Sequence, residues 1–584
     1  MKKKDTWIFG LESSIFSLSS KRRRLQPGAL DELGEGNSGD SISQSSFYFF
    51  YLVIFIVLTV FLGRLFLLTI VDGEKNRQIA ENNRIQLLRL EASRGRILDR
   101  NGAILADSKY VYKLKKGNVE KEITTEQAKD LEKLGMASEN FEGSLGKISV
   151  DVVRTYPLAE AESHVVGYTS AVTQEDLTAN KNLDPQAKVG RVGIEATYDD
   201  FLQGKAGNKL IEVDAEGKKI SVLGSVDSQK GRDIYLSLDA QLQKVAYQSL
   251  KAAAEKVGVR RGALIVQNPV TGEVLSLVSL PSYNGEDIGR SVSDLDKPFL
   301  NRVVSGTYPP GSVFKIVTAL AGLESGQIDA NTEFEDAGQF ELGGAKFANW
   351  FFLEYGQTDG VIKIVRAIAR SNDIFFFRVG EKIGLEPIHK MAVKLGYGQK
   401  TGIDLPAETF GLVPDDVWKK SALNEQWFTG DTLHMAIGQG FLLTTPIQVA
   451  RVTSFVASGR LTKPYLVSKI GSGGGFGETK FESKIDGQNL VSEKDLNLLQ
   501  SGMEQACQKG GTAFPFFDVP YKVACKTGTA EKAEGNPNAW FTVYSESFKN
   551  PIVVTVLIED GGQGSVVSAP VAREIMDWWV ANRK

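Results

Sequence analysis

Ser312 and Lys315 stand three residues apart and could together carry out acyl transfer. The preceding residues 308–311, Tyr-Pro-Pro-Gly, cannot continue a helix, whereas the residues from Ser312 onward are typical of one. The Lys315 amine should then lie on the same face as the Ser312 hydroxyl. A lysine accepts a proton only when neutral, so its pKa must fall below the usual value of about 10.4. Burial, the helix dipole and a second cation would lower it, and we expect Lys526 to be that cation.

Ser371-Asn372-Asp373 forms a second candidate motif, because it offers a hydroxyl, an amide and a carboxylate in consecutive positions. It stands between residues 361–370, which read as helical, and the apolar run 374–377. This context predicts a short loop whose side chains face a cleft. A simple helix cap is the alternative for an isolated tripeptide of this kind.

Lys526-Thr527-Gly528-Thr529 follows the alternating segment 521–525 and predicts the end of an edge strand. Glycine there would permit the close approach of a ligand backbone, and one ammonium with two hydroxyls would suit a substrate carboxylate. An ordinary strand end is the alternative. The presence of all three motifs in this order indicates a serine acyl-transfer site.

Composition argues against several other chemistries. The three histidines, His164, His389 and His434, are scattered without ligand spacing, so neither a zinc site nor a Ser-His-Asp triad is expected. The chain has 68 basic and 71 acidic side chains without a basic stripe, which argues against nucleic-acid binding. We therefore expect no metal, no organic cofactor and no nucleic-acid partner.

Residues 47–71 form an apolar segment about as long as a membrane-spanning helix. The core of a signal peptide is the alternative, but such a core is shorter and is followed by a small-residue cleavage site. Basic residues at 2–4 and 21–24 precede the segment, so the positive-inside rule places the N-terminus in the cytoplasm and the rest of the chain outside. This predicts a single-pass protein of the cell (cytoplasmic) membrane. Residues 27–46, rich in Gly, Ser and acids, predict a disordered tail.

The chain has two cysteines, Cys507 and Cys525. They could pair in an oxidising compartment, but two are too few for a disulfide framework in a chain of 584 residues. We expect two buried thiols, with Cys525 on the strand face opposite to Lys526.

The length of the chain and its patterning predict an α+β protein of more than one domain. A boundary is expected near Ser225, where a new strand-and-helix pattern begins. The predicted divisions are a cytoplasmic tail (1–46), a transmembrane helix (47–71), a first domain without catalytic motifs (72–225) and a second domain with all three motifs (226–584).

Strand-like segments from both ends of the second domain predict one antiparallel sheet packed between helices. Asp239 would cap the helix that follows the first strand. Asn101-Gly102 predicts a tight turn in the first domain. The predicted strands are 233–238, 262–268, 272–280, 540–544 and 552–558, and an amphipathic helix is predicted at 570–582.

The three motifs together resemble the signature of penicillin-binding proteins and serine β-lactamases. The resemblance to class B penicillin-binding proteins covers nearly everything from residue 47 to the C-terminus, and it includes residues 94–102, 164–168, 306–312, 436–440, 444–448 and 539–541. Asp373 and residues 427–432 resemble the elongation type, penicillin-binding protein 2, because the division type usually has asparagine at the third motif position. Residues 107–154 are short for that branch, so the partner-facing part of its first domain is expected to be reduced.

The resemblance implies a peptidoglycan D,D-transpeptidase domain preceded by an elongated α+β pedestal of the dimerisation type. Ser312 would attack the penultimate D-alanine carbonyl of a stem peptide and form an acyl-enzyme. Lys315 would accept the Ser312 proton, and Ser371, helped by Asp373, would relay a proton to the leaving group. An amine of a neighbouring peptide would complete the crosslink, and β-lactam antibiotics would acylate the same serine.

In the third motif, the resemblance implies that Lys526, Thr527, Gly528 and Thr529 bind the substrate carboxylate and polarise the site. The backbone N–H groups of Ser312 and Thr529 would form the oxyanion hole. Glycan polymerisation would come from a partner, a polytopic polymerase of the shape, elongation, division and sporulation family, since the chain has no room for a glycosyltransferase domain.

Other functions share parts of this pattern. A serine β-lactamase has the same motifs but needs neither a membrane anchor nor a large intervening domain. A D-alanyl-D-alanine carboxypeptidase uses the same chemistry with water as acceptor. A division-type transpeptidase, a β-lactam sensor and a catalytically silent scaffold stay as alternatives, although a scaffold should have lost some motif residues.

Overall fold

The computed structural model of the chain separates into two compact units, Met1–Glu81 and Asn82–Lys584, which are described one by one. Residues 1–43 of the predicted tail lie outside the described residues, so its disorder stays a prediction, while residues 44–46 belong to the first helix. The structure describes residues 44–134, 137–138, 145–181, 183–214, 219–545 and 547–583.

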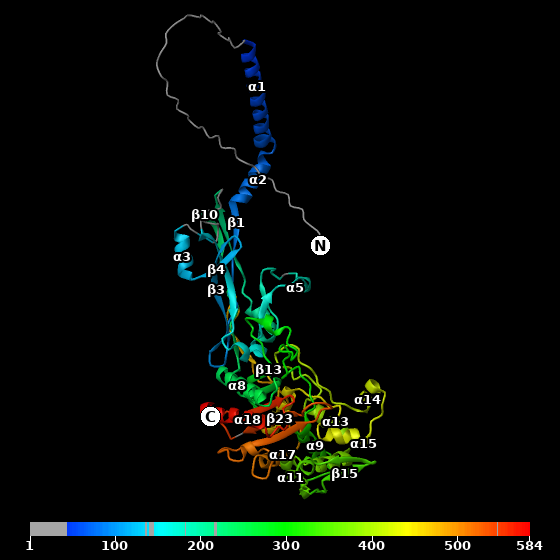
Figure 1. Cartoon of the computed structure of the whole chain (residues 1–584). Coiled ribbons are helices and arrows are strands. Elements are labelled where there is room, and N and C mark those ends of the chain that lie inside the picture. Colours follow the sequence, from blue (N-terminus) through cyan, green and yellow to red (C-terminus); the bar gives the residue numbers. More distant parts are fainter. Residues whose placement is uncertain are drawn as a thin grey trace, which may run out of the picture. The chain divides into compact units, whose positions relative to one another are not determined.

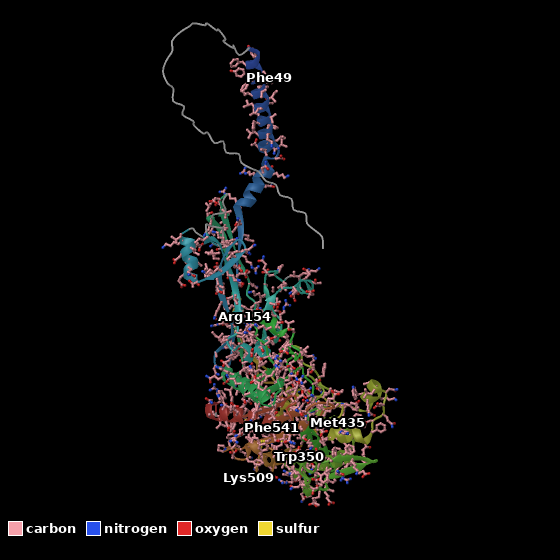
Figure 2. The ribbon with its side chains drawn as sticks, viewed as in Figure 1. Phe49, Arg154, Trp350, Met435, Lys509 and Phe541 are labelled. Carbon is pink, nitrogen blue, oxygen red and sulfur yellow. A yellow bond between two sulfur atoms is a disulfide. The ribbon has the colours of Figure 1, made fainter. Side chains whose placement is uncertain are left out.

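The first unit contains the predicted membrane segment. Helix α1 (Gln44–Phe66) continues into a π-helical turn (Leu67–Val71), and α2 (Gly73–Arg84) follows. From Phe47 onward the side chains of α1 are exposed all around the helix, as Phe49 is in Figure 2. Among the described residues, Phe47–Val71 is one stretch long and apolar enough to cross a membrane, and none of it is buried.

Two sheets make up the part of the second unit that follows α2 (Figure 1). A three-stranded antiparallel sheet has the order β1-β9-β10, and a mixed sheet has the order β20-β19-β11-β2-β3-β6-β5, with β4 paired to β3. The mixed sheet therefore takes strands from both sides of Ser225. Its strands and those of the smaller sheet are β1 (Ile85–Leu90), β2 (Ile97–Leu98), β3 (Ile104–Lys116), β4 (Val119–Ile123), β5 (Ala137–Ser138), β6 (Gly146–Thr155), β9 (Gly207–Val213), β10 (Lys219–Val226), β11 (Ile234–Leu236), β19 (Val467–Ile470) and β20 (Thr479–Lys480).

The predicted turn at Asn101-Gly102 lies between β2 and β3. The Asp99 carboxylate accepts hydrogen bonds from the backbone N–H groups of Asn101 and Ala103, and its second oxygen accepts one from the N–H of Ala240, the first residue of α8 (Ala240–Lys256). One side chain thus joins the turn to the next region. Short elements complete this part: α3 (Thr125–Lys133), a 3-10 turn η2 (Ala159–Ala161), α4 (Ser163–Val166), β7 (Thr169–Ala171), α5 (Gln174–Ala179), β8 (Lys188–Gly190), α6 (Gly193–Thr197) and α7 (Asp199–Leu202).

The predicted antiparallel sheet of the second domain has five strands in the order β13-β12-β24-β23-β22. Because buried apolar side chains alternate between its faces, it separates two cores. Helices α8 and α18 pack on one face and α16 on the other, as in Figure 1 for α8 and α18 beside β23. The elements are α8 (Ala240–Lys256), β12 (Gly262–Gln267), β13 (Val274–Leu280), α16 (Pro446–Ser458), β22 (Ala524–Ala530), β23 (Asn538–Ser545), β24 (Ile552–Ile558) and α18 (Ser568–Arg583).

Local signals explain how these helices begin. The Asp239 side chain accepts from the backbone N–H groups of Gln241 and Leu242, as predicted for the cap of α8. Helix α16 begins with a capping box between Thr445 and Gln448.

A mostly helical region lies between the early and late strands of this sheet. Here the prediction of a helix from residue 361 was wrong, because the β-branched start of that run forms β17 (Gly360–Lys363) against β14 (Glu333–Asp336). The other elements are α9 (Lys315–Glu324), β15 (Gln339–Leu342), β16 (Ala345–Ala348), α10 (Trp350–Tyr355), α11 (Ile364–Arg370), α12 (Asp373–Ile383), α13 (Leu385–Lys394), α14 (Asp416–Leu423), α15 (Thr429–Ala436), β18 (Arg460–Thr462), β21 (Ile485–Gln488) and α17 (Glu493–Ala506).

Cys507 and Cys525 form a disulfide, so the prediction of two free thiols was wrong. Helix α17 packs against β22, which brings the two Cα atoms to 5.6 Å, within the range of a disulfide. The predicted direction of Cys525 is confirmed, because this side chain lies in the core on the α8 and α18 face of the sheet while Lys526 points to the opposite face, toward Ser371.

Candidate active site

Ser312 lies in a 3-10 turn, η4 (Gly311–Phe314), that runs directly into α9. Side chains three residues apart eclipse in a 3-10 helix, so this turn favours the predicted shared face of Ser312 and Lys315. Gly311 has a φ of +56°, and a Cβ there would lie 2.8 Å from the Thr529 carbonyl oxygen. The turn that carries Ser312 therefore lies directly against the end of β22.

Ser371-Asn372-Asp373 forms the corner between α11 and α12. Ser371 adopts a left-handed conformation (φ 53°, ψ 37°) that ends α11, and the Asn372 side chain caps α12 by accepting from the Phe375 N–H at 2.9 Å. The tripeptide therefore acts as a helix cap, which was the alternative interpretation. It also directs the Ser371 and Asp373 side chains toward Lys315.

The three motifs meet at two lysines that are 0% exposed, Lys315 and Lys526. The Lys315 Nζ donates to Asp373 Oδ1 at 2.6 Å and to the Ser371 carbonyl oxygen at 2.7 Å, and it lies 3.5 Å from Ser371 Oγ. The Lys526 Nζ donates to Ser371 Oγ at 2.8 Å. Ser371 thus bridges the two amines. The Ser312 hydroxyl is half-buried and has no hydrogen-bond partner among the described residues.

The pKa values of both lysines fall below the ordinary value. Burial lowers the pKa of Lys315, and Asp373 partly opposes that effect. The pKa of Lys526 falls well below the ordinary value, first because of burial and second because of the charge of Lys315. The charge of Lys315 thus acts on Lys526, whereas the shift of Lys315 comes from burial and Asp373, so the effect of Lys526 on the pKa of Lys315 stays a prediction.

The Asp373 carboxylate is held in place by residues that the sequence analysis missed. Its Oδ2 accepts from the Trp350 N–H at 2.9 Å, and the Asp373 N–H donates to Asn349 Oδ1 at 3.1 Å. The buried Asp336 carboxylate accepts from the side-chain amides of both Asn349 and Asn372 at 2.8 Å. Asn349 directly precedes an aromatic run, the usual position of a helix cap, and that signal could have drawn attention to it.

Strand β22 is an edge of the five-stranded sheet, as predicted for the third motif. A Cβ at Gly528 would lie 2.9 Å from the Trp540 Cβ and 3.1 Å from a Val313 methyl. The missing side chain at Gly528 therefore makes room for the Ser312 turn and Trp540, and the close approach of a ligand backbone stays a prediction. Thr527 donates to the Thr512 hydroxyl at 3.0 Å, and Thr529 is partly exposed beside Gly311.

Two family descriptions match the chain. "Penicillin binding protein transpeptidase domain" matches residues 262–577, and "Penicillin-binding Protein dimerisation domain" matches residues 114–236. The peptidoglycan D,D-transpeptidase MrdA of Acinetobacter baumannii is 30% identical over 91% of this chain and 87% of its own.

Solved structures agree with this match. A penicillin-binding protein PBP2 from Helicobacter pylori, solved in a complex with MreC, has a TM-score of 0.71 and 28% identity, covering 85% of this chain and 99% of its own. A chain of a peptidoglycan synthase complex, described as coordinating polymerization and crosslinking, has a TM-score of 0.75 and 27% identity, covering 92% and 99%. The α+β fold and the resemblance to elongation-type class B proteins are confirmed, and the chain belongs to the penicillin-binding protein transpeptidase family.

Proposed function

We propose that this chain is a membrane-anchored serine D,D-transpeptidase that crosslinks peptidoglycan stem peptides during cell elongation, with Ser312 as nucleophile. One observation carries the assignment of the site residues: Ser371 Oγ lies within hydrogen-bonding distance of Lys526 and beside Lys315, next to the turn with Ser312. The relatives named peptidoglycan D,D-transpeptidase support the reaction class.

In the first half-reaction, Ser312 Oγ bonds to the penultimate D-alanine carbonyl carbon and the peptide bond to the terminal D-alanine breaks. The Ser312 proton passes to a neutral Lys315, and the pKa of Lys315, which burial lowers below its ordinary value, supports this role. Ser371 then relays a proton to the departing amine. Asp373 orients Lys315 through their 2.6 Å contact.

The oxyanion of the tetrahedral intermediate would be stabilised by the backbone N–H groups of Ser312 and Thr529. The contact between Gly311 and the Thr529 backbone supports this pairing. Removing one such donor typically costs about 2.7–4 kcal/mol of transition-state stabilisation. Lys526, Thr527, Gly528 and Thr529 would bind the terminal carboxylate along the edge strand.

In the second half-reaction, an amine of a neighbouring stem peptide attacks the Ser312 ester. The new peptide bond forms as the ester C–O bond breaks, and the amine proton returns to Ser312 Oγ through the same lysines. A β-lactam would acylate Ser312 in the same way but would leave slowly.

The proposal includes the orientation of the protein in the membrane, its domain bounds and its partner. The basic residues before Phe47 favour a cytoplasmic N-terminus and an extracytoplasmic catalytic domain at the cytoplasmic membrane. We keep residues 72–225 as the pedestal and 226–584 as the transpeptidase domain. A polytopic glycan polymerase of the shape, elongation, division and sporulation family is the proposed partner, which the similarity to a chain of a peptidoglycan synthase complex supports. Copurification of such a polymerase with the full-length chain would test this.

Intact-mass spectrometry of the full-length chain in detergent, after a fluorescent penicillin, tests the nucleophile. We expect one stable adduct on the wild type and none on Ser312→Ala. An adduct that persists on Ser312→Ala would overturn the assignment, and rapid release of hydrolysed penicillin would favour a β-lactamase.

Exchange of a labelled D-amino acid into a pentapeptide shows whether the acyl-enzyme reacts with an amine or with water. Exchange at the fifth position is expected for a transpeptidase, whereas release of D-alanine alone would indicate a carboxypeptidase.

A further inference from the structure

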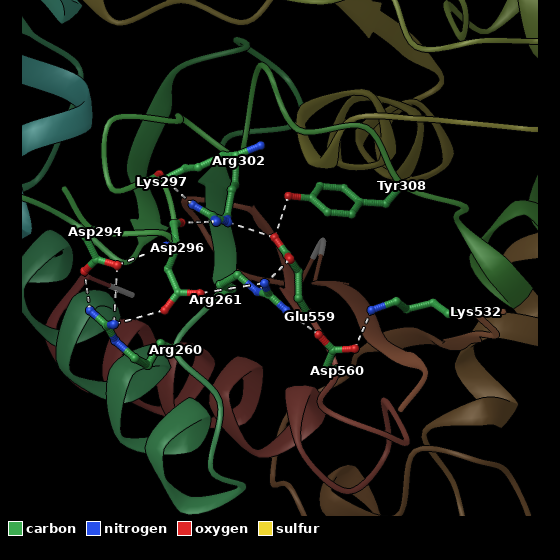
Figure 3. Close-up of polar contacts among 10 residues, drawn as sticks. All are labelled: Arg260, Arg261, Asp294, Asp296, Lys297, Arg302, Tyr308, Lys532, Glu559 and Asp560. Atoms are coloured by element: carbon green, nitrogen blue, oxygen red, sulfur yellow. Dashed lines mark hydrogen bonds and ion pairs between the residues drawn. The ribbon is translucent and has the colours of Figure 1, made fainter. Parts of the chain in front are cut away.

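An acidic pair at the end of β24, Glu559-Asp560, lies between the segment before Ser312 and the loop after β22 (Figure 3). Glu559 Oε1 accepts hydrogen bonds from the Tyr308 hydroxyl and from Arg302 Nε, both at 2.8 Å. Tyr308 precedes Ser312 by four residues. A carboxylate outside the three motifs therefore binds the segment that leads directly into η4, the turn that contains Ser312 and is called the nucleophile turn below.

Two arginines hold Glu559 in place. The Arg302 side chain is 3% exposed, and its guanidinium also donates to the Asp296 carbonyl at 2.6 Å and to the Lys297 carbonyl at 3.2 Å. Arg261 Nε lies 3.1 Å from Glu559 Oε2. Since each oxygen of Glu559 faces a fixed cation, the carboxylate is a rigid acceptor for Tyr308.

Tyr308 connects the fixed Glu559 carboxylate to the segment that precedes Ser312. Burial and then the charge of Glu559 raise the pKa of Tyr308, so its hydroxyl stays a donor. Its backbone pairs with Thr444 in both directions, at 2.9 and 2.8 Å, and its ring packs edge-on against Trp540. Trp540 Nε1 in turn donates to the Pro309 carbonyl at 3.0 Å. The residues before Ser312 are thus attached to β23 and β24.

Asp560 makes the corresponding connection on the other side. Its carboxylate pairs with Lys532 and with Arg261, and Lys532 follows Thr529 by three residues. The Asp560 backbone has a φ of +56°, and its N–H donates to Asn538 Oδ1 at 3.1 Å at the start of β23. Two consecutive carboxylates therefore bind the two segments that meet where Gly311 contacts Thr529.

We propose that Glu559 and Asp560 are positioning residues that set the separation of the Ser312 and Thr529 backbone N–H groups in the oxyanion hole. This inference rests on the proposed function, because it uses the roles assigned there to Ser312 and Thr529. Neither carboxylate touches the reacting atoms. They act through Tyr308 and Lys532, to which they are joined in Figure 3.

Stopped-flow acylation of the full-length chain in detergent by a fluorescent penicillin tests the proposal, because it separates the dissociation constant of the initial complex from the acylation rate constant. We expect Tyr308→Phe and Glu559→Gln each to lower the acylation rate constant about 10- to 100-fold, as small displacements of catalytic groups do. The dissociation constant should change less than about twofold. The double variant should be little slower than the slower single variant, since both changes break one path.

Arg260→Gln is the matched control. Arg260 belongs to the same cluster in Figure 3, but its side chain is 58% exposed and it binds Asp294 and Asp296 rather than the acidic pair. Its acylation rate constant should equal that of the wild type. Lys532→Met tests the second connection and should slow acylation less than Tyr308→Phe, because Lys532 is partly exposed.

A purely structural role would lower the thermal midpoint and the fraction of acylated protein while the folded fraction reacts at the wild-type rate, and that result would overturn the proposal. If Glu559→Gln does not fold, Tyr308→Phe still decides, because it removes one hydroxyl and leaves Glu559 paired with both arginines. Failure of the proposed function would look different, since an adduct would then persist on Ser312→Ala.

Discussion

Two clusters of buried charge in the molecule differ in how the charge is compensated. In the first domain, Glu195 is 0% exposed and lies between Arg94 (2.5 Å) and Arg154 (2.6 Å). In the catalytic domain, two buried lysines lie near a single carboxylate, Asp373, which pairs with Lys315. Burial alone would lower the pKa of Arg94, but Glu195 and Asp199 raise it above its ordinary value, whereas the pKa values of both lysines fall.

The difference follows from the side chains. A guanidinium stays charged in proteins and offers donors in a fixed planar arrangement. A buried arginine therefore needs a carboxylate partner, and the pair stays charged. An ammonium can lose its proton, so a buried lysine can become a base. The first cluster thus stabilises the fold, and the second holds groups whose protonation can change during a reaction.

Lys526→Met should have the largest effect on activity. Removing an amine that takes part in proton transfer or charge stabilisation typically costs about 10²- to 10⁴-fold, and we expect the acylation rate constant to fall by that much. Thermal stability should hold or rise, because an apolar side chain replaces a buried amine without a carboxylate of its own. Stopped-flow acylation and calorimetry measure the two effects.

Lys522→Met is the matched control for that change. Lys522 lies four residues earlier, its side chain is 69% exposed, and it pairs with Glu504. It should leave both acylation and stability near the wild-type values. A large loss of stability in Lys526→Met would mean that this lysine supports the fold as the arginines do.

Glu195→Gln should show the reverse behaviour. Two buried guanidiniums would lose their shared counter-charge, and breaking a buried pair in this way costs about 3–5 kcal/mol of unfolding free energy. Denaturant unfolding should show this loss, while the folded fraction acylates at the wild-type rate. Asp151→Asn, which changes an exposed pair with Lys188, should cost less than about 1 kcal/mol. Equal losses in the two variants would remove the distinction between the clusters.

Asp373→Asn should sharpen the role of the lysine pair through the pH dependence of acylation. Asp373 raises the pKa values of both lysines against the effect of burial, so its removal lowers them further. The base then stays neutral to lower pH, and the acid limb of the pH–rate profile should move down by about one unit or more. Acylation at the plateau should also slow, since Lys315 loses its orienting contact. If the acid limb stayed in place or moved to higher pH, the titrating group would be one other than these lysines.

Much of the site could be predicted because the residues next to each motif indicate the local structure in which that motif lies. Ser312 and Lys315 share one turn, and the strand around Lys526 alternates visibly, so the serine, the amines and the edge strand could be predicted from the sequence. The buried runs of β12, β13, β23 and β24 likewise predicted a sheet built from both ends of its domain.

Contacts between distant segments could not be predicted in this way. The Cys507–Cys525 bond depends on how α17 packs on β22, and the supports of Asp373 come from Asn349 and Trp350, some 24 residues earlier in the chain. Tyr308 and Glu559 are 251 positions apart and make their contact only because β24 ends beside the nucleophile turn. Apart from Asn349, which stands at the usual position of a helix cap, these residues look like ordinary strand ends or loops in the sequence.

Glu162 is a third kind of buried charge, a carboxyl without a cation. It is 1% exposed, its Oε1 accepts from the Leu158 N–H at 2.8 Å, and its Oε2 has no partner among the described residues. Burial raises its pKa to about 8 from an ordinary value of 4.5. The folded state therefore binds more protons than the unfolded state between those values, and its unfolding free energy should fall as the pH rises from about 4.5 to 8.

Glu162→Gln removes this titration while it keeps the shape of the side chain. The variant should match the wild type near pH 5 and exceed it above pH 8, where we expect a gain of about 1–3 kcal/mol, the cost of an unsatisfied buried group. Unfolding curves of both proteins across this pH range measure the difference. Glu160→Gln is the control, because the Glu160 side chain is half exposed and should give a curve parallel to that of the wild type. A parallel curve for Glu162→Gln as well would mean that Glu162 keeps its ordinary pKa and that this domain tolerates a buried carboxylate without an arginine.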